Sequence, residues 1–187
     1  MKYLLLILLF SASAFGQVVE YHVDTKAKNV VKFISDAPVE DFEGVTNKID
    51  GYLKYNGASL TENSEIYFEV DLRTLDTGIG LRNRHMREEY LHTDKYPYAK
   101  FSGRIESVRD AGSNKIAAVK GSMDIHGVKK PMDVKATLAP EGSGLRSKVS
   151  FEVKLTDHKI EVPKFMFLKI DEVMQLELDI QLKKVKG

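Results

Sequence analysis

The sequence predicts an all-β domain of antiparallel strands, with one short helix inserted between strands near residues 80–91. Three observations predict this fold class: apolar and polar residues alternate along several segments, turn sequences separate those segments, and one charged stretch has helical spacing. Because a two-residue period gives each strand one dry and one wet face, the alternation is typical of antiparallel sheet.

Residues 1–16 have the composition of a secretory signal peptide. Lys2 precedes an apolar run from Leu4 to Phe10, and small residues follow it. The run is shorter than the roughly 20 residues that span a bilayer. We expect cleavage after Ala14 or after Gly16 and favour Gly16, which leaves residues 17–187 as one folded domain.

Four later segments show the alternation most clearly. Their apolar positions are Ile66, Phe68, Val70 and Leu72; Met132, Val134, Ala136 and Leu138; Leu145, Val149, Phe151, Val153 and Leu155, with Ser147 in the same phase; and Met174, Leu176, Leu178, Ile180 and Leu182. Turn signals such as Asn56-Gly57, His126-Gly127 and the stretches 110–114 and 140–144 separate the segments. This spacing gives about eight candidate strands, the number at which a closed barrel can hold one small ligand. The alternation alone fits a sandwich as well as a barrel.

Two segments depart from the alternation. Gly80 to Leu91 is charged and places Leu81, His85, Met86 and Tyr90 at helical spacing, which predicts a short helix that plugs or covers one end of the barrel. Residues 160–168 end in four consecutive apolar side chains, including Phe165 and Phe167, after Pro163. That run suits either a buried strand or a portal loop.

Composition argues against several classes of function. Residues 17–187 contain no cysteine and carry 27 basic and 27 acidic residues, so no nucleic-acid partner is expected. They contain no second apolar run of spanning length, so we do not expect an integral membrane protein. No Gly-x-Ser-x-Gly elbow and no phosphate-binding glycine loop is present, and the five histidines show no metal-ligand spacing. We therefore expect no catalytic residue and no metal site, although a hydrolase with an unrecognised carboxylate pair stays an alternative.

A family resemblance appears in residues 75–101. Leu75-Asp76-Thr77-Gly78, then Arg82 to Arg87, then Asp94-Lys95-Tyr96-Pro97 and Phe101, resemble the signature of YceI-like proteins. Residues 121–131 resemble the Gly-x-Leu-Thr-Ile-x-Gly-Val-Thr-Lys-Pro hairpin of that family. Asn83 stands where the family often has Asp.

The resemblance implies a lipocalin-like barrel of about eight antiparallel strands that binds an isoprenoid or quinone-like lipid in its lumen, with no other cofactor. The expected role is an exported carrier or buffer, periplasmic or secreted. The alternative is a non-catalytic envelope interaction module with a filled barrel. A homodimer stays open, because incomplete barrel closure would leave a strand edge for pairing.

Apolar side chains and a small polar group make up the expected ligand site. The predicted lining residues are Phe33, Phe68, Val70, Leu72, Phe101, Ile105, Phe151, Val153, Leu155, Phe165, Phe167, Leu176, Leu178 and Ile180. Arg82 and Arg84 are expected to meet a polar head group, with the solvated face of a helix as the alternative. His85 matches the histidine of the family signature, and the resemblance implies a structural hydrogen bond or a place in the pocket lining for it.

Overall fold

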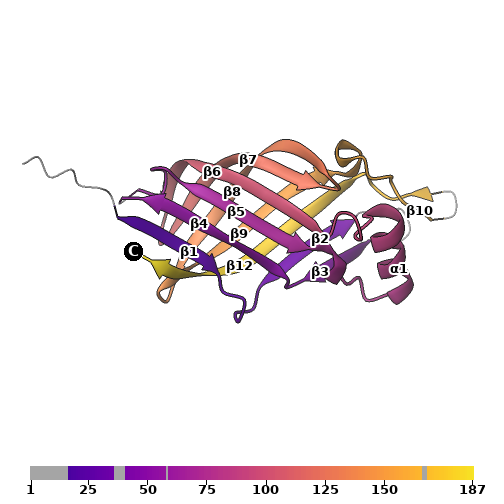
Figure 1. Cartoon of the computed structure of the whole chain (residues 1–187), viewed down its shortest axis with the longest axis horizontal. Coiled ribbons are helices and arrows are strands. Elements are labelled where there is room, and N and C mark those ends of the chain that lie inside the picture. Colours follow the sequence, from indigo (N-terminus) through magenta and orange to yellow (C-terminus); the bar gives the residue numbers. More distant parts are fainter. Residues whose placement is uncertain (1–16, 36–40, 58, 166–167) are drawn as a thin grey trace, which may run out of the picture.

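An antiparallel barrel closes where the last strand, β12 (Val173–Lys186), pairs with the first, β1 (Val18–Val23). The computed structural model describes residues 17–35, 41–57 and 59–187 except 166–167. Between the closing strands the ring order is β4 (Ile49–Asn56), β5 (Glu65–Asp71), β6 (Tyr98–Ala111), β7 (Asn114–Ile125), β8 (Val128–Glu141) and β9 (Gly144–Lys154). The predicted eight-stranded antiparallel barrel is confirmed (Figure 1).

At two places in the ring, two short strands lie end to end and together take the place of one long strand. β2 (Val30–Ser35) continues the line of β1 along β12, and β3 (Phe42–Thr46) pairs with β2 as β4 pairs with β1. The side chain of Asn29 spans the break between β1 and β2: its amide donates to the Asp24 carbonyl oxygen at 2.9 Å, and its Oδ1 accepts from the Gln181 N–H at 2.8 Å. These bonds satisfy backbone groups that a continuous strand would have paired.

One end of the barrel, which we call the helix end, carries the connections with helical turns (Figure 1). Between β5 and β6 lie a 3₁₀ turn (Leu72–Thr74), α1 (Gly80–His85) and a π-helical turn (Met86–Tyr90), so the predicted helix is confirmed. Between β9 and β12 lie another 3₁₀ turn (Leu155–His158) and the hairpin β10 (Lys164–Phe165) and β11 (Leu168–Lys169). Leu72 and Leu155, which the alternation placed in strands, each begin a 3₁₀ turn because the chain bends there at the rim.

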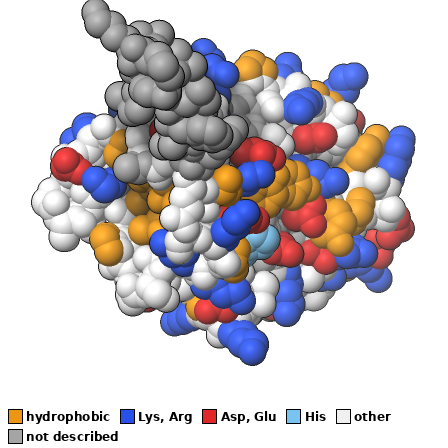
Figure 2. Space-filling model, turned by 60° about the vertical axis from the view of Figure 1, so that its left-hand side comes forward, with side chains coloured by type: hydrophobic (Ala, Val, Ile, Leu, Met, Phe, Trp, Pro, Cys, Tyr) orange, Lys and Arg blue, Asp and Glu red, His pale blue; other side chains and the backbone are white. Residues whose placement is uncertain are grey.

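The opposite end, which we call the terminal end, carries the C-terminus and the start of β1 (Figure 1). The barrel interior is apolar, whereas basic and acidic side chains lie side by side over the face seen in Figure 2. Pairs on the outer wall include Lys32 Nζ with Glu177 Oε2 at 3.0 Å and Arg146 Nε with Asp179 Oδ1 at 2.5 Å. The pKa of Asp179 is lowered by its hydrogen bond from Arg146. Inner and outer faces thus differ as the alternation predicts.

Candidate functional site

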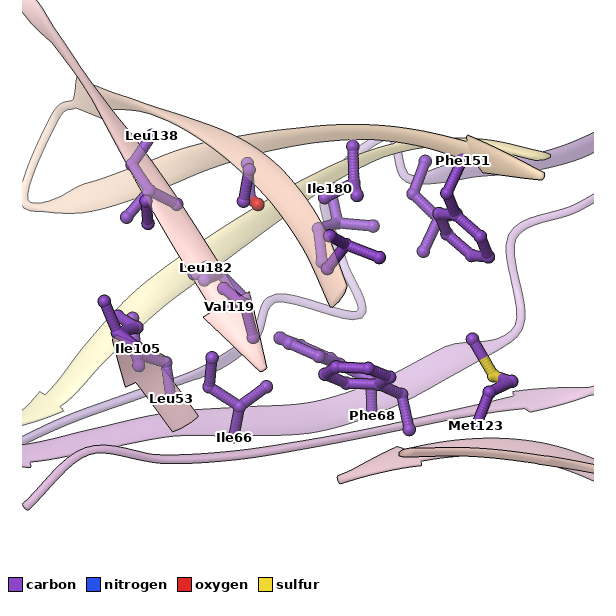
Figure 3. A pocket seen from close by; sticks show the side chains of 17 residues that line it. Leu53, Ile66, Phe68, Ile105, Val119, Met123, Leu138, Phe151, Ile180 and Leu182 are labelled. Carbon is purple, nitrogen blue, oxygen red and sulfur yellow. The ribbon is translucent and has the colours of Figure 1, made fainter. Parts of the chain in front are cut away.

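The interior of the barrel contains an apolar lumen lined from β4 through β9 and from β12 (Figure 3). It encloses about 90 Å³, and its empty space together with the part open to solvent is about 690 Å³. Measured in the same way, a cavity needs about 10–15 Å³ to hold one water molecule, so this hollow is larger than a packing defect. The lining residues are Leu53, Ile66, Phe68, Phe101, Ile105, Ala117, Val119, Met123, Val134, Ala136, Leu138, Ser147, Val149, Phe151, Leu178, Ile180 and Leu182.

Glycines on neighbouring strands provide space for the phenylalanine rings of the inner wall. A Cβ built on Gly51 would meet the Tyr67 carbonyl oxygen and lie 2.6 Å from Phe68 Cδ1. One built on Gly121 would meet the Ser102 carbonyl oxygen and lie 2.5 Å from Phe101 Cζ. Phe33 likewise lies directly over Gly44, its partner across β2 and β3. A glycine inside a strand often marks such a close approach. Because each ring occupies the space of a missing side chain, it stays against the wall and leaves the lumen open.

The terminal end of the interior is filled by tyrosines. Tyr21 and Tyr55 stack with ring centroids 6.5 Å apart, and both pack with Leu60 against the main hydrophobic cluster. Burial raises the pKa of Tyr55 to about 12, with a smaller contribution from Tyr21. The phenol is therefore neutral at physiological pH, which suits an apolar surrounding.

The helix end of the interior is covered by residues of the π-helical turn and the bend after it. Tyr90 and Leu91 pack with a second cluster of buried residues, Met123, Ile125, Val153 and Ile160. Met123 also lines the lumen, so this cluster and the lumen are continuous. The inserted segment therefore packs over the barrel interior.

Side chains of the inserted segment hold one another in place. The buried Asn83 accepts hydrogen bonds at Oδ1 from the N–H and the hydroxyl of Thr77, at 2.8 and 2.7 Å, and donates to Asp76 Oδ1 at 2.7 Å. The bond from Asn83 lowers the pKa of Asp76. The Arg82 guanidinium lies 4.4 Å from the centroid of the Phe42 ring, and its Nε and Nη2 donate to Thr77. Arg82 therefore fixes the start of α1 against β3.

Three histidines join the connections at the helix end. His92 Nδ1 and His126 Nε2 are 2.8 Å apart, and the stacked rings have centroids 5.1 Å apart. His126 Nδ1 faces the His158 carbonyl oxygen at 3.2 Å, and His158 Nδ1 faces the Val128 carbonyl oxygen at 2.9 Å. Burial lowers the pKa of His126. Sequence spacing missed this cluster because its members are 34 and 32 residues apart.

The predicted site residues occupy three kinds of position. Phe68, Phe101, Ile105, Phe151, Leu178 and Ile180 line the lumen. The others lie outside that lining. Val70 packs on the main hydrophobic cluster, and Val153, Leu155 and Leu176 belong to the second cluster, at the helix end. Leu72 is buried in its 3₁₀ turn, and Phe33 stacks edge-on with Phe42. Arg84 is exposed, and the His85 side chain is 43% exposed with Nε2 3.8 Å from Glu89. Phe167 lies outside the described residues, as does the side chain of Phe165, and residues 1–16 of the predicted signal peptide also lie outside them.

The residues predicted to line the lumen include none of those that β4, β7 and β8 contribute, and they leave out Ile66, Ser147, Val149 and Leu182. Ala117 and Ala136 pair across β7 and β8, and their short side chains widen the lumen there. The signal was available for β8, where Val134, Ala136 and Leu138 alternate with polar residues. Over the part of the chain that the structure describes, no group of three or more His, Asp or Glu side chains is placed to hold a metal ion. Within the same residues, no helix has both the length and the apolar character needed to cross a bilayer.

Comparison with known proteins identifies relatives of both sequence and structure. The family model for the YceI-like domain matches residues 21–182. A UPF0312 protein of Shewanella denitrificans is 28% identical over 126 residues, which cover 66% of this chain and 64% of that protein. A UPF0312 protein of Pseudomonas savastanoi pv. phaseolicola is 32% identical over the same shares. The match thus spans just under two thirds of the length of these relatives.

Two solved structures share the fold. BcnA of Burkholderia cenocepacia superposes with a TM-score of 0.71 at 19% identity, covering 85% of this chain and 98% of BcnA. A polyisoprenoid binding domain from Saccharophagus degradans, implicated in plant cell wall breakdown, superposes with a TM-score of 0.67 at 17% identity, covering 88% of this chain and 98% of that domain. At such identities the likeness shows a common barrel.

Proposed function

The chain belongs to the YceI-like family, as its motifs predicted, and we propose that it reversibly binds an isoprenoid or quinone-like lipid in its lumen. The observation that carries the proposal is the lumen itself, whose lining among the described residues includes no charged side chain and a single polar one, Ser147. The polyisoprenoid binding domain of Saccharophagus degradans has the same fold. We further propose a carrier or buffer role after export to the periplasm or the medium.

Burial of hydrocarbon is sufficient to supply useful affinity in such a lumen. Each buried CH₂ group contributes about 0.8 kcal/mol, so a ten-carbon stretch offers roughly 8 kcal/mol before the costs of association. The enclosed 90 Å³ accommodates only part of a long chain. The remainder and any polar end would therefore lie beyond the enclosed hollow.

The competing function is an interaction module with a filled barrel, and the small enclosed volume is the observation that favours it. Native mass spectrometry of protein exported by its own leader and purified without detergent separates the two. The expected result is a bound mass near that of a polyprenyl chain or quinone, released by solvent extraction. Protein without bound mass, unchanged after incubation with such lipids, would instead establish the filled barrel.

Variants of the lumen make the same experiment residue-specific. Phe151→Asp places a charge in the lumen, whereas Ser150→Asp places the same charge on the exposed outer face of β9. Ala136→Phe fills the lumen without adding charge, for the case in which Phe151→Asp prevents folding. We expect the two lumen variants to lose the bound lipid and Ser150→Asp to retain it. Equal retention by a folded Ala136→Phe would refute binding at this place.

A further inference from the structure

Exposed aliphatic side chains are concentrated at the helix end of the barrel. Among the residues that the structure describes, four large hydrophobic side chains are exposed: Val45 (39%), Ile79 (52%), Leu81 (56%) and Val185 (51%). Val45 and Asp76 exchange two backbone hydrogen bonds of 2.9 Å, which brings Val45 beside the segment that starts α1. Ile79 and Leu81 belong to that segment, so three of the four lie around one corner of the rim.

Three arginines lie at this corner of the rim. Residues 77–87 contain these three arginines, and carboxylates flank them on both sides. Asp76 accepts hydrogen bonds from Gly78 and Asn83, and Glu89 lies 3.8 Å from His85. Arg84 is exposed, Arg82 lies on the Phe42 ring, and Arg87 donates to the backbone carbonyls of Asn83 and Arg73 at 3.1 and 2.9 Å. Within the described part of the chain, none of the three lies within 4 Å of a carboxylate oxygen, although the charge of Arg87 contributes to the lowered pKa of Asp76. The outer wall differs, because several of its cations, such as Lys32 and Arg146, are paired with carboxylates.

We propose that Val45, Ile79, Leu81 and Arg84, together called the rim patch, dock this protein on the surface of a lipid bilayer that contains anionic lipids. Exposed aliphatic side chains beside cations match the two components of an interfacial surface, the acyl boundary and the negative head groups. The occupant is assigned from this charge complementarity and from the place of the patch. α1 is joined directly to the π-helical turn whose Tyr90 packs over the interior, so docking would present the helix end of the barrel to the membrane.

The proposal rests on the proposed lipid-binding function for its purpose, but its test is independent of any bound lipid. Purified protein is floated with vesicles of phosphatidylcholine alone and with vesicles containing phosphatidylglycerol, at low and at physiological salt. We expect partition to the anionic vesicles that falls as salt is raised, because exposed charges are screened. Ile79→Asp with Leu81→Asp should reduce partition at least tenfold, and Arg84→Gln about fivefold.

Val185→Asp provides the matched control. Its side chain is about as exposed as those of Ile79 and Leu81 but lies near the C-terminus, at the terminal end. An equal loss of partition in Val185→Asp, or no partition of the unaltered protein to anionic vesicles, would overturn the proposal. Self-association that depends on Ile79 and Leu81, in protein that does not bind vesicles, would overturn it in favour of a second copy of the chain.

Native mass spectrometry of the same samples separates this proposal from the proposed function. Bound lipid without vesicle partition would refute docking alone. Partition that depends on the rim patch, in protein that never carries lipid, would support docking and refute the lumen as a lipid site.

Discussion

Replacing Ser147 by alanine should stabilise this protein, because the Ser147 hydroxyl is a polar group inside an apolar lumen. Ser147 is 5% exposed and pairs with Leu138 on β8 and Ile180 on β12, both of which also line the lumen. Its hydroxyl borders the hollow and has no hydrogen-bond partner among the described residues. A buried hydroxyl without a partner costs about 1–3 kcal/mol in protein mutational data.

Removing the hydroxyl creates little new cavity, so the change in the free energy of unfolding is set mainly by the desolvation cost that is no longer incurred. We expect Ser147→Ala to raise the free energy of unfolding by about 1 kcal/mol. For a chain of this size that corresponds to an increase in Tm of about 2–4 °C. Ser147→Val should add up to about 1.6 kcal/mol from two buried carbon groups, since the lumen has room for them.

Urea denaturation followed by circular dichroism measures this effect directly. Ser150→Ala is the matched control, since Ser150 is exposed on the outer face of the same strand, and its change should stay within about 0.5 kcal/mol. A loss of 1 kcal/mol or more in Ser147→Ala would refute the reasoning, because it would mean that the hydroxyl is satisfied. Lipid retention should be unchanged in Ser147→Ala if the ligand segment at that depth is pure hydrocarbon.

Three further predictions concern the wall of the barrel and its histidine cluster. Leu182→Ala removes a side chain that is 1% exposed and should lower the free energy of unfolding by about 3–5 kcal/mol in urea, against less than about 0.5 kcal/mol for the exposed Val185→Ala. Gly121→Ala should cost about 1–3 kcal/mol, because the added methyl meets both the Ser102 carbonyl oxygen and the Phe101 ring, and bound lipid in native mass spectra should fall as the ring is displaced; unchanged binding and stability would contradict the close approach. Because burial lowers the pKa of His126, the unfolded chain takes up its proton first as pH falls through about 6.5. The free energy of unfolding should therefore decrease as the pH falls from about 7 toward the lower folded-state pKa of His126. His126→Asn should make this dependence on pH weaker, and an increase of stability on acidification would disprove it.

The sequence was sufficient for the strands and the helix because both are local patterns. The two-residue period of residues 66–72 and 174–182 predicted the inward positions, and the helical spacing of residues 80–91 predicted one short helix where α1 and the π-helical turn lie. Closure was not predictable from the alternation, since it depends on pairings such as Tyr21 with Lys184 between opposite ends of the chain. The family resemblance, which carries the topology, supplied that choice.

For the lumen, too, one part of the structure was predictable from the sequence and another was not. Alternation identified Phe68, Phe151 and Leu178 as inward, but it does not tell a filled interior from a hollow one. The hollow depends on what lies opposite each ring, namely glycines such as Gly51 and Gly121 on adjacent strands. In the sequence these glycines look only like weak positions of a strand, because the residues that they face become known only with the register of the strands.

A lumen without charged side chains constrains how a ligand can be selected. Its lining offers one hydroxyl, so discrimination among hydrocarbons would rest on the cross-section between the Phe68, Phe101 and Phe151 rings. One methylene more or less in an apolar pocket changes binding by only about 1–3 kcal/mol, so chain length alone is a weak basis for selecting a ligand. A branched isoprenoid and a straight acyl chain of equal carbon number differ in width along their whole length. The glycine positions that hold the rings against the wall should therefore control ligand class more strongly than any polar residue of the barrel.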